Sequence, residues 1–453
     1  MPSGYLPKKS WRSWDYKPDF ARRQRRRGKG SRESLNTPFS ACPAKIAQET
    51  ILHYLIIGGG PAGLSAAATL RRIDEKGCVT ILSKEKHPPY ARIALPYLLT
   101  GAAEKLLFLP IPAGVDLVLG DEAAEVNPKK HEVRTASGKK FLFDKLLVAT
   151  GATPLRPGIE GIDLPFVTTI RDLRDVRAVE ERLKVRKTGH CVVAGAGPVG
   201  LELSDALHKR GLTTTLVISS DRIFSAMLDR ATSALLGKRL AENGVEVRKN
   251  TDIARICSSG EVLLSSGQSR FCDVVIIGKG VAPTLDFLAR SGIAVRRGIP
   301  VDEHQETNIP GIYAAGDVAE TRDIVYGDSR VNALWPVAFE QGKVAAYNMA
   351  SYPLAYEGSF SRNLLRVFDT SILAAGMAMA DAPEVYSEDG SDFRHKLVLD
   401  QGILKGFAFV GEPRNVGLYI DLLRRRADIT SCVDSLLHGS YDYAQFLKKS
   451  TKQ

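Results

Sequence analysis

Residues 53–67 read HYLIIGGGPAGLSAA, and this stretch decides the fold. An apolar run of strand length enters a G-x-G-x-x-G turn, and an alanine-rich helical run follows it. In such a turn the first glycine, Gly58, permits the sharp bend, and Gly60 leaves room for a pyrophosphate beside the backbone. The third, Gly63, lets the helix and the strand pack closely. Strand, turn and helix together predict a dinucleotide-binding unit.

The helix that begins at Pro61 and Ala62 supplies the other half of this site. Its first amides have no partners within the helix and its N-terminal end carries partial positive charge, so both favour a phosphate. A second strand, Val79–Leu82, follows, and an acidic residue at its end is expected to bind the ribose. Ser83 occupies the commonest acidic position, so Glu85, the nearest carboxylate, is our candidate. The alternative for Glu85 is a solvent-facing charge between two lysines.

A second copy of the design begins about 137 residues later, where residues 190–203 read HCVVAGAGPVGLEL. The same physical argument applies to its turn, so the chain is predicted to bind two dinucleotides. The residues of the second turn expected at the dinucleotide are Gly195, Gly197, Pro198, Val199 and Gly200.

The coenzyme preference of the second unit stays open in the sequence. Its second strand, Thr214–Ile218, places Ile218 where a carboxylate would select NADH, and Asp221 and Arg222 come shortly after. An acid would repel a 2′-phosphate and an arginine would attract it, but neither is clearly placed. The retained third glycine, Gly200, favours NADH slightly over NADPH.

Three further apolar strands each break into a glycine-containing turn, at residues 146–154, 274–283 and 311–319. Their order indicates that the first unit is interrupted by the second and then resumes, which gives an α/β fold with two Rossmann-like domains. The last segment lacks a glycine fingerprint and includes two strand-like runs, Lys396–Leu399 and Gly406–Val410, so we expect a C-terminal α+β domain. The predicted divisions are residues 1–48 as a disordered basic extension, 49–163 with 285–355 as the first, discontinuous dinucleotide-binding domain, 164–284 as the second, and 356–447 as the C-terminal domain.

Composition narrows the class of protein. The chain has 453 residues, is 44% hydrophobic and carries a formal charge of +11. Residues 1–36 hold eleven Lys and Arg against three acids, so most of this charge lies in a segment of a kind that is usually disordered. No run approaches the roughly 18 uncharged apolar residues of a membrane-spanning helix. A soluble, cytoplasmic protein without a membrane span is expected.

The six cysteines lie far apart, and no close pair suggests a zinc site or a redox dithiol. We therefore expect reduced thiols and no metal site. The six are Cys42, Cys78, Cys191, Cys257, Cys272 and Cys432.

Taken in order, these motifs resemble the pyridine nucleotide-disulfide oxidoreductase superfamily over about residues 52–447. The resemblance implies that the first fingerprint holds the ADP moiety of FAD and the second holds NADH or NADPH. It thereby implies FAD for the first domain, NAD(P) for the second and an interface role for the C-terminal domain. It also implies that Asp317 bonds the FAD ribityl chain, and that the helix near Ala338 points its positive end at the flavin. The other positions expected at the cofactors are Ala149, Thr150, Gly151, Gly280 and Gly316.

Members of this superfamily differ in how electrons leave the flavin. Coenzyme A-disulfide reductases carry a cysteine just before Gly-Leu-Pro-Tyr, and this chain has Ile93 at that place. The stretch instead resembles thiol-free relatives such as nitrite reductase flavin domains, rubredoxin reductases and the FAD subunit of phenylglyoxylate dehydrogenase. That resemblance places Arg92 beside the flavin, whereas the plain alternative is a surface charge. Glu202, on the first turn of the second helix, could orient the nicotinamide or simply compensate the helix dipole.

We therefore expect an FAD-dependent NAD(P)H oxidoreductase in which hydride moves between nicotinamide C4 and flavin N5. Without a redox cysteine, electrons would pass directly to or from an acceptor or an iron–sulfur partner, in a homodimer or a larger complex. One alternative is a stand-alone NADH oxidase, peroxidase or coenzyme A-disulfide reductase-like enzyme. Another is a non-catalytic flavoprotein that binds a partner or nucleic acid through its basic N-terminus, which deletion of residues 1–44 would test.

Overall fold

The computed structural model describes residues 51–185, 187–380, 384–412 and 415–445. The basic segment over residues 1–48, Cys42 and the last two residues of the predicted C-terminal domain lie outside these ranges. Among the described helices, none combines the length and the apolar character needed to cross a bilayer.

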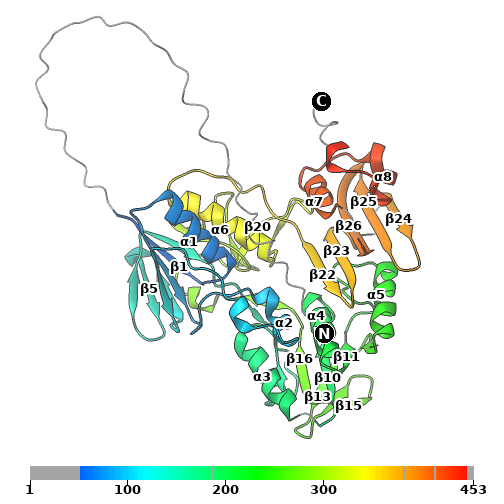
Figure 1. The fold of residues 1–453 in the computed structure, drawn as a ribbon. Coiled ribbons are helices and arrows are strands. Elements are labelled where there is room, and N and C mark those ends of the chain that lie inside the picture. The colour runs from blue at the N-terminus through cyan, green and yellow to red at the C-terminus, as the bar shows by residue number, and fades with distance from the viewer. Residues whose placement is uncertain (1–50, 186, 381–383, 413–414, 446–453) are drawn as a thin grey trace, which may run out of the picture. The chain divides into compact units, whose positions relative to one another are not determined.

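The first layer is a parallel five-stranded sheet in the order β19-β7-β1-β2-β3. Its buried strands are nearly continuous runs of Ile, Leu and Val with few polar residues, as a sheet covered on both faces requires. Helices α1 (Pro61–Ile73) and α6 (Trp335–Met349) lie side by side on one face (Figure 1). The strands are β1 (His53–Ile57), β2 (Cys78–Ser83), β3 (Val115–Leu119), β7 (Lys145–Val148) and β19 (Ile312–Ala314).

The second layer repeats this topology, with the parallel order β12-β11-β10-β16-β9. Its strands are β9 (Val167–Thr168), β10 (His190–Ala194), β11 (Thr213–Val217), β12 (Val245–Arg248) and β16 (Val274–Ile277). Its helices are α3 (Leu173–Lys184), α4 (Pro198–Lys209) and α5 (Arg230–Glu242). All five strands lie in the chain between β7 and β19, so the second Rossmann-like unit is inserted in the first, as predicted.

Short ribbons accompany both layers. One joins β8 (Ala152–Pro154) to β17 (Val281–Pro283), directly after the strands β7 and β16. The others are β4 (Ala123–Asn127), β5 (Glu132–Thr135) and β6 (Lys140–Leu142); β13 (Ile253–Ile256), β14 (Glu261–Leu264) and β15 (Ser269–Phe271); and β18 (Ile299–Pro300), β20 (Ala319–Arg322) and β21 (Ser329–Arg330). These ribbons are antiparallel except for the parallel pair β18–β20.

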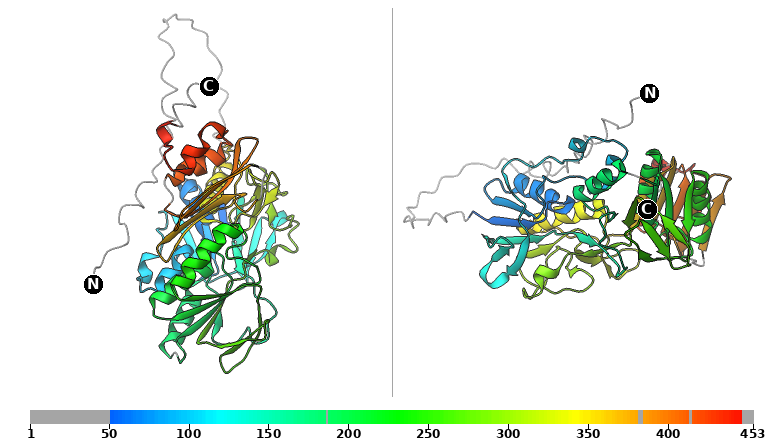
Figure 2. Two further views of the ribbon diagram at one scale, coloured as in Figure 1. Left: turned by 90° about the vertical axis from the view of Figure 1, so that its right-hand side faces the viewer. Right: turned by 90° about the horizontal axis from the view of Figure 1, so that it is seen from below.

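The C-terminal part is an antiparallel sheet in the order β22-β23-β26-β25-β24 with helices α7 (Val416–Arg424) and α8 (Val433–Leu437) (Figure 2). Alternate residues of one strand serve opposite faces: Phe407 and Phe409 pack with α7 and α8, whereas Ala408 and Val410 join the core of α4 and α5. The strands are β22 (Arg362–Val367), β23 (Thr370–Gly376), β24 (Glu384–Asp389), β25 (Arg394–Asp400) and β26 (Ile403–Gly411). The expected α+β class is confirmed, while the numerical domain boundaries stay a prediction.

Candidate functional site

The first glycine turn is shaped by two close backbone contacts and one open space. A Cβ at Gly58, where φ is +116°, would lie 2.1 Å from the carbonyl oxygen of Ala149. A Cβ at Gly63 would lie 2.0 Å from the oxygen of Gly58, whereas no heavy atom lies within 4 Å of the corresponding point at Gly60. Helix α1 has Pro61 in its first turn and no side-chain cap, so its first amides face that space unpartnered by a capping side chain.

The space at Gly60 belongs to a cavity of about 420 Å³ at the carboxyl edge of the first sheet. Segments far apart in the chain line it, and most of the residues predicted for the first site are among them. The predicted residues in the lining are Gly58, Gly60, Pro61, Ala62, Glu85, Arg92, Ala149, Thr150, Gly151, Gly316, Asp317 and Ala338. Gly63 lies beneath the turn and outside the lining.

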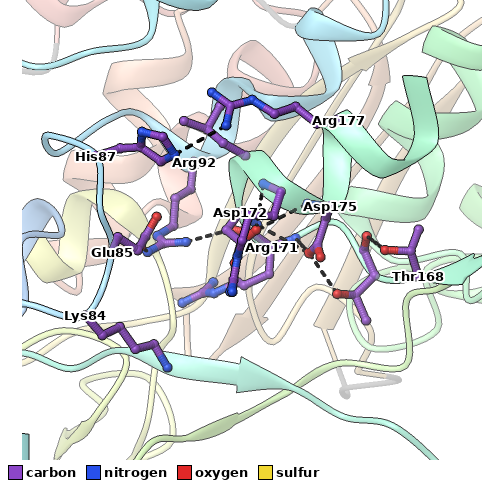
Figure 3. Close-up of polar contacts among 12 residues, drawn as sticks. Lys84, Glu85, His87, Arg92, Thr168, Arg171, Asp172, Asp175 and Arg177 are labelled. Carbon is purple, nitrogen blue, oxygen red and sulfur yellow. Dashed lines mark hydrogen bonds and ion pairs between the residues drawn. The ribbon is translucent and has the colours of Figure 1, made fainter. Parts of the chain in front are cut away.

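Glu85 and Arg92 both line this cavity and form an ion pair with each other (Figure 3). The Arg92 guanidinium donates to Glu85 and, at 2.7 Å, to the carbonyl oxygen of Arg171. The hydroxyl of Tyr90 donates to the other Glu85 oxygen at 2.7 Å, and burial raises the pKa of Tyr90, which keeps that proton in place. The Glu85 side chain is therefore bonded within the lining of the cavity and does not face solvent as the alternative interpretation had it.

Gly316 and Asp317 follow β19 and close the opposite side of the cavity. The backbone amide of Gly316 donates to the buried side-chain oxygen of Gln341 at 2.7 Å. Its φ is +83°, and an added Cβ would crowd Ala62 and Ala338, so the chain turns here against the first turns of α1 and α6. The carboxylate of Asp317 lies 3.3 Å from the guanidinium of Arg171.

The second glycine turn repeats the contacts of the first. A Cβ at Gly195 would lie 2.2 Å from the oxygen of Gly278, one at Gly200 would lie 2.0 Å from the oxygen of Gly195, and Gly197 again faces open space. Pro198 begins α4 and Val199 is exposed beside it. These residues form a separate group from the first cavity, at the carboxyl end of β10.

Glu202 is the fifth residue of α4, so it follows the first turn of the helix and does not lie on it, contrary to the expectation from the sequence. Burial, together with the charge of Asp205, raises the pKa of Glu202 to about 7, so both of its protonation states are populated at neutral pH. Helix α2 (Leu95–Leu98) packs against α4 and carries Tyr97. Partial burial of the Tyr97 phenol raises its pKa, and the nearby charge of Glu202 raises it further. Gly280 lies at the β8–β17 ribbon, where its carbonyl oxygen accepts from the amide of Leu155 at 2.9 Å.

The sequence pattern of the pyridine nucleotide-disulphide oxidoreductase family matches residues 52–342. The chain belongs to this family. It is an FAD-dependent NAD(P)H oxidoreductase, as the superfamily resemblance implied.

Three similar proteins illustrate the range of the family. The epsilon subunit of an NADH-dependent phenylglyoxylate dehydrogenase from Aromatoleum evansii is 29% identical, over 83% of this chain and 92% of the relative. An NADH oxidase from Methanocaldococcus jannaschii is 28% identical, over 80% and 88%. The structure of NADH:rubredoxin oxidoreductase from Clostridium acetobutylicum is 25% identical with a TM-score of 0.70, and the match covers 86% of this chain and all of that one.

Several residues of this oxidoreductase line the first cavity or support it without a signal in the sequence. Arg171 comes from the connection between β9 and α3, and Thr284 accepts through its carbonyl oxygen from the Thr150 hydroxyl at 3.0 Å. Gln341 follows Ala338 by one helical turn on α6 and bonds the Gly316 amide. None belongs to a glycine motif, so only the folded arrangement identifies them.

Proposed function

We propose that FAD lies in the first cavity, that the nicotinamide dinucleotide binds at the second glycine turn, and that electrons pass directly to or from a bound redox protein. Bound FAD supplies the hydride acceptor and donor, and the protein supplies binding, orientation and exclusion of water. The proposal extends the family assignment to named residues and to the route by which electrons leave.

The residues present in the first cavity fit FAD. Gly60 leaves the backbone of the turn open at the N-terminus of α1, which is the environment that a pyrophosphate requires. Asp317 offers a carboxylate to hydroxyl groups, and its partner Arg171 offers a cation on the same side. Trp335 and Ala338 bring the first turn of α6 to the lining, so a second helix N-terminus is directed at the site.

The observation that carries direct transfer is Ile93 on the rim of this cavity. Its side chain is 55% exposed and lines the cavity at the place where the coenzyme A-disulfide reductases carry their cysteine. No cysteine occurs among the described residues that line the cavity. Burial raises the pKa of the Cys191 and Cys272 thiols to about 12, so neither supplies a thiolate at neutral pH.

Exposed apolar side chains beside this cavity support a protein acceptor. Ile93, Tyr97 and Phe339 are each at least half exposed: Ile93 lines the cavity, Tyr97 lies on α2, and Phe339 follows the lining residue Ala338 on α6. A contiguous apolar patch is typical of docking surfaces, and we propose that these side chains contribute to one. A multi-subunit dehydrogenase and a rubredoxin reductase are among the similar proteins, so we propose an iron–sulfur or rubredoxin-type partner.

An anaerobic experiment tests the whole proposal. FAD-loaded protein is titrated with NADH and then NADPH while the flavin absorbance is followed, and iodoacetamide is added after reduction. We expect flavin reduction, followed by full electron transfer to added rubredoxin or [2Fe–2S] ferredoxin despite alkylation. Loss of transfer after alkylation would overturn direct transfer, and failure of both nucleotides to reduce the flavin would overturn the site assignment.

The similarity to an NADH oxidase supports a second candidate acceptor, molecular oxygen. Oxygen uptake with NADH and no added protein measures it in the same preparation. We expect uptake to be slow compared with rubredoxin or ferredoxin reduction, and the opposite ranking would favour the oxidase.

A further inference from the structure

The end of β11 lacks the carboxylate that selects an unphosphorylated ribose. In a dinucleotide-binding sheet of this topology, the adenosine ribose lies against the end of the second strand, which is β11 in the second layer. The residues after β11 are Ile218, Ser219 and Ser220, and Ile218 is buried at 3% exposure. A 2′-phosphate would therefore meet serine hydroxyls there and no acidic side chain on the strand end itself.

A cation reaches this place from a different strand. Lys279 follows β16, which lies on the far side of β10 from β11. Its ammonium donates to the Ser219 hydroxyl across 3.4 Å and also pairs with Asp252. The Lys279 side chain is only 21% exposed, while that of Asp252 is 48% exposed. The amine is thus held at the strand end by one hydroxyl and one carboxylate that is free to turn toward water.

A backbone contact fixes the position of the turn that carries Lys279. The oxygen of Gly278 packs directly on Gly195, where no Cβ could be accommodated, so the turn that carries Lys279 touches the second glycine turn. A dinucleotide whose pyrophosphate lies at Gly197 would place its adenosine next to both turns. Lys279 is therefore positioned by the same contact that builds the dinucleotide site.

The arginines of the neighbouring loop are already engaged. Arg222 donates to the carbonyl oxygens of Leu228 and Ser225 and pairs with Asp221 at 3.0 Å. Arg230 pairs with the same Asp221 at 2.5 Å, so two cations share one carboxylate and the loop keeps an excess of positive charge. This charge favours an anion nearby, but Lys279 is the cation that faces Ser219.

We propose that Lys279 and Ser219 form a subsite for the 2′-phosphate of adenosine, and that this protein prefers NADPH to NADH. The inference rests on the proposed assignment of the second sheet to the nicotinamide dinucleotide. On binding, the ammonium exchanges the Asp252 carboxylate for the phosphate, and the Ser219 hydroxyl donates to a phosphate oxygen. In the sequence, Gly200 gave a slight preference for NADH. The positive charge of Lys279, which only the fold brings to the end of β11, would outweigh that preference.

Binding of NADP⁺ and NAD⁺ to the oxidised, FAD-loaded full chain, measured by calorimetry, tests the subsite without turnover. We expect NADP⁺ to bind roughly tenfold or more tightly than NAD⁺, as a charge-assisted bond to the phosphate would give. Lys279→Met should remove this advantage and leave NAD⁺ binding unchanged. Asp252→Asn, which frees the ammonium, should tighten NADP⁺ severalfold, and Ser219→Asp should reverse the preference.

A matched control is Lys238→Met on α5. Lys238 is exposed, pairs with Glu242 and lies in the carboxyl half of its helix, which runs toward the opposite edge of the sheet. It removes the same charge and should change neither affinity. Equal binding of both nucleotides, or an unchanged NADP⁺ affinity in Lys279→Met, would overturn the subsite. Binding of neither nucleotide would instead overturn the assignment of the second sheet.

Discussion

The crossing of α1 and α6 depends on Gly342, and replacing it with alanine gives the sharpest structural prediction. A Cβ at Gly342 would lie 2.1 Å from the carbonyl oxygen of Ala62, on the first turn of α1. Normal contact between such atoms needs well over an ångström more, and the obstacle is backbone that a rotamer change cannot move. Because the N-termini of both helices line the first cavity, separating the helices should also displace the proposed FAD site.

The expected magnitude follows from two opposing effects. Overpacking a well-packed contact costs about 1–3 kcal/mol, and this clash with backbone belongs at the upper end. Alanine in a helix gains about 1 kcal/mol over glycine, so the net loss in the free energy of unfolding should be about 2 kcal/mol. Gly417→Ala is the matched control, because Gly417 also lies in a helix but has open space at its Cβ position. It should be neutral or stabilising by up to about 1 kcal/mol.

Denaturant unfolding followed by the fluorescence of Trp335, the first residue of α6, measures the change at the crossing itself. Trp11→Phe and Trp14→Phe in the background leave Trp335 as the single tryptophan. A fluorescence titration with FAD then measures affinity, which should fall severalfold in Gly342→Ala and stay unchanged in Gly417→Ala. Equal unfolding midpoints for the two variants, or unaltered FAD affinity in Gly342→Ala, would refute the reasoning.

Three further substitutions have effects that the structure predicts. Burial raises the pKa of Glu202 to about 7. Glu202→Gln should therefore abolish a pH dependence of flavin reduction centred near 7, which stopped-flow measurement can show. The same substitution should raise the free energy of unfolding relative to wild type at pH 8 but not at pH 5, because the buried carboxylate is charged only at the higher pH. Burial raises the pKa of Asp273, but the hydrogen bonds that it accepts from the amides of residues 187–189 lower it below its usual value. The contribution of Asp273 to the free energy of unfolding is therefore present above the unfolded pKa and lost as the pH falls through the folded pKa. Asp273→Asn should therefore cost about 1–3 kcal/mol in urea unfolding at neutral pH and less in acid. Lys396, 1% exposed, pairs with Asp229 at 2.8 Å, so Lys396→Met should cost about 3–5 kcal/mol in the same assay, and adding Asp229→Asn should recover much of it.

The glycine turns could be predicted from the sequence because their chemistry is local. Gly58 and Gly195 must be glycine because a backbone oxygen after a neighbouring strand lies where a Cβ would be. Each glycine also belongs to a strand-turn-helix pattern within about fifteen residues of sequence. The strands β25 and β26 likewise enclose the predicted runs Lys396–Leu399 and Gly406–Val410. The predicted strand Thr214–Ile218 is offset by one residue from β11 (Thr213–Val217).

The rest of the site depends on contacts between distant segments, which no local pattern records. Arg171 reaches Asp317 across 146 positions of the chain, and Arg92 reaches the Arg171 carbonyl across 79. Gly342 is an unremarkable helical glycine until α1 lies against it. The position of Ser83 pointed to Glu85 as a lone acid, whereas the fold shows that both of its oxygens are already bonded by Arg92 and Tyr90.

These pairings explain how one chain can hold two dinucleotides with different requirements. In the first cavity two of the lining carboxylates have arginine partners, Glu85 with Arg92 and Asp317 with Arg171, so these two acids are paired charges that still offer acceptors to hydroxyl groups. At the end of β11 the residues 218–220 carry no acid, and the cation Lys279, which is paired with Asp252, lies against Ser219. Under our proposal, the two sites differ in the charges placed just beyond the glycine turns, while the turns themselves are alike. The substitution Ser219→Asp at the second site should accordingly change the preference between NADH and NADPH and leave FAD binding intact.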